Sequence, residues 1–146
     1  MSMVGARIDI SKGLDGEAVV LACFDLDEER LAGSAHAVAA AAAERYRTAV
    51  MSSDDVLVLR ELTALADELR DAALTAGIRT VVLRPARLTA YRDALAHFVE
   101  SRDAAEWLRE KDREPLALVR PMLLDLEDLC ADALRAALSG CLEPRC

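Results

Sequence analysis

The hydrophobic and polar positions divide the chain into stretches of helical periodicity and short apolar segments. The clearest helix is predicted to begin after Ser52, where a hydroxyl cap precedes Asp54 and Asp55, two negative charges suited to a helix N-terminus. Apolar residues then recur at spacings of three or four, which predicts one buried stripe made of Val58, Leu62, Leu65, Leu69, Ala72 and Ala76. Gly77 stands where a left-handed residue would cap the end of this helix.

Three segments have the pattern of β-strands. Residues 6–10 alternate between apolar and charged side chains, as in a half-exposed strand, and residues 17–24 are almost continuously apolar, as in a strand buried on both faces. The glycine-containing turn at 13–16 joins these two segments into a predicted hairpin. Residues 78–83 are rich in β-branched side chains and supply the third strand that a stable hairpin needs.

Two more helices surround these elements. Asp25 or Asp27 caps a helix that extends to about residue 50, and its buried side is predicted to be Leu31, Ala35, Val38, Ala42, Tyr46 and Ala49. Pro85 suits the first turn of the next helix. The inward positions of that helix are Leu88, Tyr91, Leu95, Phe98 and Val99.

The region after this helix is predicted to be irregular. Asp103 and Glu106 form a possible capping box, which favours a helix break near residues 101–102. Trp107 and Leu108 then begin a short helical piece, and the charged run 109–114 is interpreted as a solvated connector.

A last helix carries the stripe Leu116, Val119, Leu123, Leu126, Cys130, Ala133 and Ala137. Pro121 lies inside this pattern and is expected either to kink the helix or to mark its true start. Gly140 is predicted to end it.

Together these elements predict a single domain over residues 1–146. Its fold class is α+β, mainly α, with four main helices packed on a sheet of about three strands, in the order β-β-α-α-β-α-α. Residues 1–24 are its N-terminal hairpin and residues 141–146 a frayed tail. The pattern does not decide whether the helices cover one or both faces of the sheet.

The composition narrows the possible partners. The formal net charge is −8, which disfavours nucleic acid and anionic membrane surfaces and favours basic proteins, small ligands or a second copy of the chain. Aromatic residues make up only 3%, so the core must consist mainly of Leu, Val and Ala. The longest apolar run, residues 18–24, is too short for a membrane span. A cytoplasmic location is expected, because the first residues also lack an apolar signal segment.

We interpret the cysteines and His36 as structural residues, without a role in catalysis or metal binding. Cys23 and Cys130 are expected to be buried thiols, and Cys141 and Cys146 could form a disulfide on oxidation. His36, among alanines, is expected to be partly buried and hydrogen-bonded.

Two acids follow the second strand directly. Asp25 and Asp27, separated by one residue after an apolar strand, resemble the nucleophile and acid of haloacid-dehalogenase-type phosphatases. That resemblance implies a metal-dependent phosphohydrolase that uses Mg²⁺. The residues that follow, Glu28 and Glu29, depart from the glycine and threonine of that family. The structural interpretation is a helix cap with favourable first-turn charge.

The segment between Asp71 and Asp93 contains four arginines and no acid. Arg84 and Arg87 flank the point where a strand ends and a helix begins, with Thr89 close by, so these three residues form a candidate site for an anionic small molecule such as a nucleotide or phosphate ester. The alternative is that these arginines pair with acids of neighbouring helices or of another subunit.

Other chemistry has weaker support. Asp93, His97 and Glu100 share one helical face, where a surface charge stripe is the favoured interpretation over a metal site. No nucleophile elbow, P-loop or dinucleotide motif is present in the sequence, and no catalytic residue, metal or cofactor is predicted. We therefore expect a non-enzymatic protein of the regulatory, adaptor or inhibitor type that acts through protein–protein interaction. Apolar stripes on every helix predict a homodimer, and the acidic charge also suits a basic protein partner.

Overall fold

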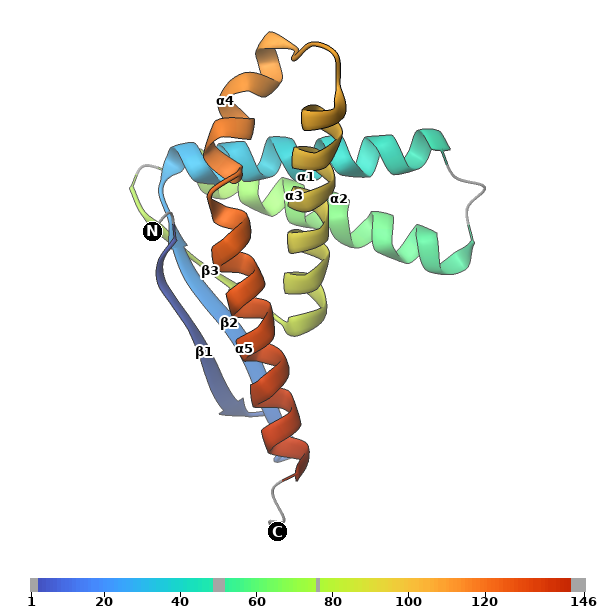
Figure 1. The fold of residues 1–146 in the computed structure, drawn as a ribbon. Helices are drawn as coiled ribbons and strands as arrows, with labels where there is room; N and C mark the ends of the chain where they lie inside the picture. Colours follow the sequence, from blue (N-terminus) through green and yellow to red (C-terminus); the bar gives the residue numbers. More distant parts are fainter. Residues whose placement is uncertain (1–2, 49–51, 76, 143–146) are drawn as a thin grey trace.

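A computed structural model describes residues 3–48, 52–75 and 77–142. Within these ranges the fold is α+β, with five helices and one antiparallel sheet of three strands (Figure 1). The elements are, in order, β1 (Val4–Lys12), β2 (Ala18–Leu26), α1 (Glu28–Thr48), α2 (Ser53–Ala73), β3 (Arg79–Leu83), α3 (Pro85–Ala104), α4 (Glu110–Val119) and α5 (Met122–Leu142).

The predicted hairpin and its third strand are confirmed. β2 lies in the centre of the sheet, antiparallel to both β1 and β3, with Ala22 opposite Ile8 on one side and Leu83 on the other. The turn closes through a hydrogen bond of 2.7 Å from the Gly13 N–H to the carbonyl oxygen of Glu17. Gly16 in this turn has φ of 83°, a conformation that glycine adopts without strain.

The helices cover one face of the sheet, a choice that the pattern left open. Ala22, Phe24 and Leu26 of β2 point into the core, whereas Arg7 and Asp9 of β1 lie exposed on the other face. The prediction that the second strand is buried on both faces is confirmed in part: on the outer face Cys23 is buried, whereas Leu21 and Asp25 are half-buried. Among the described residues no helix covers this outer face, and Asp25 lies there beside Thr80.

The helices pack in two antiparallel pairs that cross one another (Figure 1). α1 and α2 lie side by side and run across α3 and α5. The core beneath the sheet is centred on Phe24, which stacks on Tyr91 of α3 with ring centroids 5.9 Å apart. The buried hydroxyl of Tyr91 lies 2.6 Å from Ser34 Oγ of α1, so the polar end of this ring is satisfied.

The helix caps and stripes agree largely with prediction. Ser52 forms a capping box with Asp55, and the inward positions of α3 are all buried. In α2 the buried residues are Leu59, Leu62, Leu65, Ala66 and Leu69, so the stripe is rotated away from the predicted Val58 and Ala72. Gly77 has φ of 97° as predicted, but α2 ends earlier, at a C-cap on Leu74. In α1 the predicted stripe is buried as far as its side chains are described, through Ala42; Tyr46 and Ala49 lie outside that part.

The region after α3 differs from prediction. α3 continues through Ala104 without a break, and Asp103 accepts two hydrogen bonds from Arg120 instead of forming a box with Glu106. Trp107 is 70% exposed in an irregular segment and begins no helix. The charged run is not a connector, because α4 begins within it at Glu110.

The predicted last helix is two helices. α4 ends at Val119 and α5 begins at Met122, so Pro121 marks a start, one of the two predicted alternatives. Proline lacks the N–H that a continuous helix would require. α5 passes Gly140 and ends at Leu142, since one glycine costs a helix only about 1 kcal/mol. The remainder of the predicted tail lies outside the described residues.

Candidate functional site

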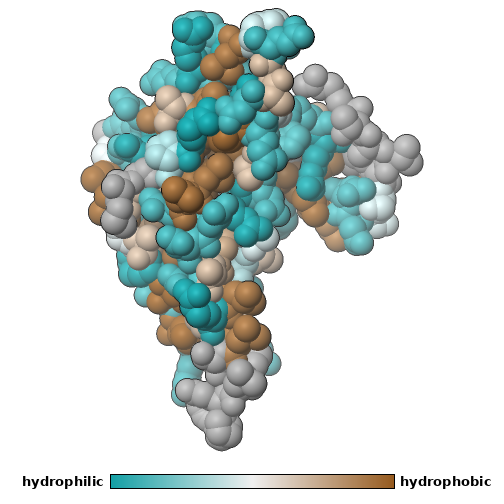
Figure 2. Space-filling view, in the orientation of Figure 1, coloured by the Kyte–Doolittle hydropathy of each residue, from teal (hydrophilic) through white to brown (hydrophobic). Residues whose placement is uncertain are grey.

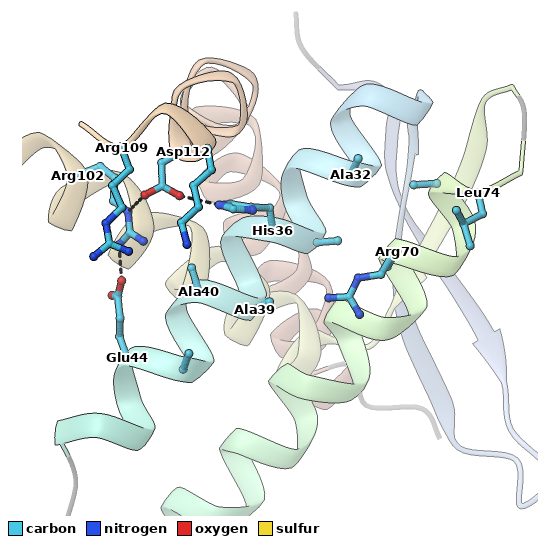
Figure 3. A pocket seen from close by; sticks show the side chains of 14 residues that line it. Ala32, His36, Ala39, Ala40, Glu44, Arg70, Leu74, Arg102, Arg109 and Asp112 are labelled. Carbon is cyan, nitrogen blue, oxygen red and sulfur yellow. Dashed lines mark hydrogen bonds and ion pairs between the residues drawn. The ribbon is translucent and has the colours of Figure 1, made fainter. Parts of the chain in front are cut away.

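A cleft of about 600 Å³ lies over the solvent side of α1 (Figure 3). Its floor is a row of small side chains on α1: Ala32, Ala39, Ala40 and Ala43. One wall is the C-terminal half of α2 with Arg70 and Leu74, and the other is the junction of α3 with α4. Because alanine side chains end at Cβ, the floor of the cleft lies close to the α1 backbone. We call this cleft the α1 groove.

An ionic network occupies one end of the α1 groove. Asp112 of α4 is only 3% exposed, and its carboxylate lies 2.7 Å from His36 Nε2 and accepts a hydrogen bond of 3.2 Å from Arg102 Nε. Arg102 also pairs with Glu44 of α1, which in turn pairs with His97. Side chains from α1, α3 and α4 are thereby joined in one chain of contacts.

The network rests directly on the apolar core. The Arg102 guanidinium carbon lies 4.4 Å from the ring centroid of Phe98, and His36 packs edge-on against the same ring at 5.8 Å. Both contacts are favourable geometries for an aromatic face. The predicted environment of His36, partly buried and hydrogen-bonded, is confirmed.

The network keeps both carboxylates ionised. Burial raises the pKa of Asp112, but the hydrogen bond with His36 and the charge of Arg102 outweigh it, and the pKa is lowered overall. Burial likewise raises the pKa of Glu44, and its hydrogen bonds with Arg102 and His97 lower it to a net value below the usual range. A buried carboxylate is therefore tolerated here as an anion.

Sequence reasoning missed Asp112 because it lies in a highly charged run. One signal was available: Asp112 precedes Leu116 by four positions and Val119 by seven, so it occupies the inward stripe of α4. α4 can approach α1 closely because α1 has a glycine at the crossing. A Cβ on Gly33 would lie 3.3 Å from Leu118 Cδ1.

Three basic side chains line part of the α1 groove. Arg109 and Lys111 lie at the start of α4, and neither forms an ion pair with any described residue. Arg70 lies on the α2 side of the alanine floor, across from Arg109 (Figure 3), and among the described residues its ion pair is with Asp67 on its own helix, at 3.1 Å. Acidic side chains lie at the other end, where Glu28, Glu29 and Glu114 line a hollow that adjoins the groove at Ala32 and His36.

At the predicted anion site, Arg87 follows the alternative interpretation, in which the arginines pair with acids of a neighbouring helix. Arg87 donates hydrogen bonds to Glu61 at 2.9 Å and to Glu68 at 2.6 Å, and the bond with Glu68 is the main reason that its pKa is raised. Thr89 Oγ1 donates to the carbonyl oxygen of Pro85, one turn earlier. Arg84 is the N-cap residue of α3 and lies beside a largely apolar hollow of about 540 Å³ between α2 and α3.

The other candidate residues are engaged separately. Asp25 accepts a hydrogen bond of 2.7 Å from Thr80, whereas Asp27 caps α1 by accepting from the Arg30 N–H at 2.9 Å. Asp93 pairs with the neighbouring Arg92, and His97 pairs with Glu44. Within residues 3–48, 52–75 and 77–142, no group of three or more potential ligands could hold a metal ion.

The cysteines agree with prediction in part. Cys23 is buried and Cys130 is half-buried, both are free thiols, and burial raises the pKa of each. The side chains of Cys141 and Cys146 lie outside the described residues.

The outer face of α5 carries exposed leucines. Leu124, Leu134 and Leu138 are 71%, 61% and 51% exposed, on the side opposite the buried stripe of Met122, Leu126, Leu129 and Ala133. Apolar surface is visible over the lower part of α5 in Figure 2. Glu127, Asp128, Asp132 and Arg135 lie among these leucines in the sequence and are exposed, and Arg135 forms an ion pair with Asp132. We call this surface the α5 outer face.

Comparison with known proteins found no matching family model, no matching curated protein and no matching solved structure. Within the described part of the chain, no helix is both long enough and apolar enough to cross a membrane.

Proposed function

We propose that this protein is a non-enzymatic, self-associating interaction module of the regulatory, adaptor or inhibitor type that works in the cytoplasm as a homodimer. The observation that carries the proposal is the α5 outer face. The helix buries one leucine stripe and displays three further leucines on its opposite side, and apolar surface gathered on one exposed helix face is found at interaction sites.

The α1 groove supports the same proposal. Its polar groups at one end, Asp112, Glu44 and Arg102, are already paired with one another or with histidines, so they hold the groove walls in place. The described side chains that line it include no serine, threonine or cysteine. A groove with an alanine floor and paired acids suits the binding of a helix better than covalent catalysis.

Sedimentation velocity on the intact chain tests self-association. We expect the mean sedimentation coefficient to rise to that of a dimer as the concentration increases to about 100 µM, because a homodimer forms by mass action. A strict monomer over this range would contradict the homodimer. The acidic charge also suits a basic protein partner, and such a complex should weaken as salt concentration is raised.

An anionic small molecule at Arg84 and Arg87 is the alternative function. The hollow beside Arg84 supports it, and Arg84 forms no ion pair with a described residue. Its test is thermal shift with ATP and with inorganic phosphate, on the wild type and on Arg84→Ala. Stabilisation that disappears in the variant favours this alternative, and no stabilisation by either probe rejects it for these ligands.

A further inference from the structure

We propose that the partner is a second copy of this chain, and that the α5 outer face of each copy docks in the α1 groove of the other. This inference rests on the proposed self-association and assigns the two surfaces that produce it.

The shapes are compatible. Small residues on a helix let a second helix approach closely, and a row of alanines leaves depressions between them that leucine side chains can fill. The floor from Ala32 to Ala43 extends about 16 Å, and the α5 outer face from Leu124 to Leu138 extends about 21 Å, at a rise of about 1.5 Å per residue. Leu74, which is exposed on the α2 wall, adds apolar contact at the edge.

The charges are complementary. The rim of the α1 groove offers Arg109 and Lys111, which have no ion-pair partner in the described part of the chain, and Arg70 on the opposite wall. The α5 outer face offers Glu127 and Asp128, neither of which forms a hydrogen bond or ion pair within its own copy among the described residues. Two exposed cations on one surface and two exposed anions on the other give the two surfaces opposite local charge, which favours their association between molecules.

A two-fold axis is the proposed symmetry of the dimer. Each copy carries one groove and one outer face, so a dimer related by such an axis uses both surfaces of each copy, whereas any other rotation would continue into a larger ring or a filament. A neighbouring hollow continues the groove from Glu44 and Arg102 to Trp107, which is 70% exposed. Trp107 is the single tryptophan of the chain, so its fluorescence reports directly on this end of the groove.

Charge reversal provides the test. The groove variant is Arg109→Glu with Lys111→Glu, and the helix variant is Glu127→Lys with Asp128→Lys. All four side chains are exposed, so both variants should fold, which circular dichroism verifies. Each variant alone faces like charges and should weaken self-association by at least about tenfold in Kd, measured by sedimentation.

Mixing makes the test specific. The groove variant has two acidic surfaces and the helix variant two basic ones, so an equimolar mixture should form a one-to-one dimer and change the Trp107 emission, although neither variant self-associates. The control for the groove variant is Arg60→Glu with Arg113→Glu, which alters net charge equally at exposed positions away from the α1 groove. The control should retain the wild-type Kd.

The outcomes separate the two proposals. A monomeric wild type overturns both. A wild type that dimerises with the same Kd as both reversed variants overturns the assigned surfaces and leaves self-association standing. Recovery of the dimer only in the mixture establishes the assigned surfaces, and growth of the wild type beyond a dimer overturns the closed two-fold arrangement.

Discussion

Helix α3 passes through two regions that are built on different principles. Near its start, Tyr91 stacks on Phe24 beneath the sheet, and the surrounding side chains are almost all apolar. Near its end, Phe98 is covered by Arg102 and His36, and the next layer is the buried Asp112. In the first region the sheet covers the core. In the second, α1 and the ten residues of α4 do so, and charged partners fix where the short helix α4 docks. The comparison indicates that apolar burial supplies stability at one end of α3, while ion pairing supplies positional specificity at the other.

The largest effect is expected in the apolar region. Phe24→Ala removes a fully buried ring and its stacking partner for Tyr91, and should lower the free energy of unfolding by about 3–5 kcal/mol. Urea denaturation measures the change. Leu14→Ala in the exposed hairpin turn is the control and should change it by less than about 0.5 kcal/mol. A loss below about 1 kcal/mol for Phe24→Ala would mean that the sheet is not the main cover of the core.

The ionic region should respond nearly as strongly. Arg102→Met keeps a long side chain over Phe98 but leaves the buried Asp112 with one partner fewer, and should cost about 2–4 kcal/mol. Arg113→Met removes an exposed ion pair with Glu110 on the same helix as Asp112 and should cost only about 0–0.5 kcal/mol. Equal losses in these two variants would show that the Asp112 network is no stronger than a surface pair.

The pH dependence sharpens this contrast. The folded-state pKa values of Asp112 and Glu44 are lowered, so their contribution to stability is present above their ordinary values of 3.8 and 4.5 and is lost as pH falls through the lowered ones. Arg102→Met removes the main counter-charge. The difference in unfolding free energy between wild type and this variant should therefore be largest near neutral pH and shrink in acid. A difference that is constant from neutral pH to pH ~3 would exclude the network as its source.

A smaller effect is expected where the two regions meet. The hydroxyl groups of Ser34 and Tyr91 are fully buried and form a hydrogen bond with each other. Ser34→Ala should lower the free energy of unfolding by about 1–2 kcal/mol, because the tyrosine hydroxyl loses its partner. Adding Tyr91→Phe removes that unsatisfied group and should recover part of the loss. Denaturation of the single and double variants measures the coupling, and strictly additive losses would contradict it.

The sequence pattern predicted most of the fold correctly because the signals for these elements come from residues close together in the chain. The hydroxyl cap at Ser52, the hairpin turn and the inward positions of α3 each depend on residues within a few positions of one another. The α2 stripe was predicted with a small rotation, because both Val58 and Leu59 are apolar and only packing against α1 and α3 selects between them.

The α1 groove was not predictable in the same way. The run 109–114 has the same composition whether it is solvated or docked, and only the position of His36 and Arg102 makes Asp112 a buried anion. Arg87 is a second example. Its position at a helix N-terminus was predicted correctly from nearby residues, but the two acids that bind it, Glu61 and Glu68, belong to α2.

The sequence by itself determined the three strands, most of the helices and the cap at Ser52, and that the chain is acidic and poor in aromatic residues. Only the tertiary structure decided that all helices lie on one face of the sheet, that a charged run docks through Asp112, and that an alanine row on α1 remains open beside unpaired cations. Periodicity and capping are encoded over a few residues, whereas ion pairs and grooves join positions tens of residues apart, and their partners are fixed only when the helices pack.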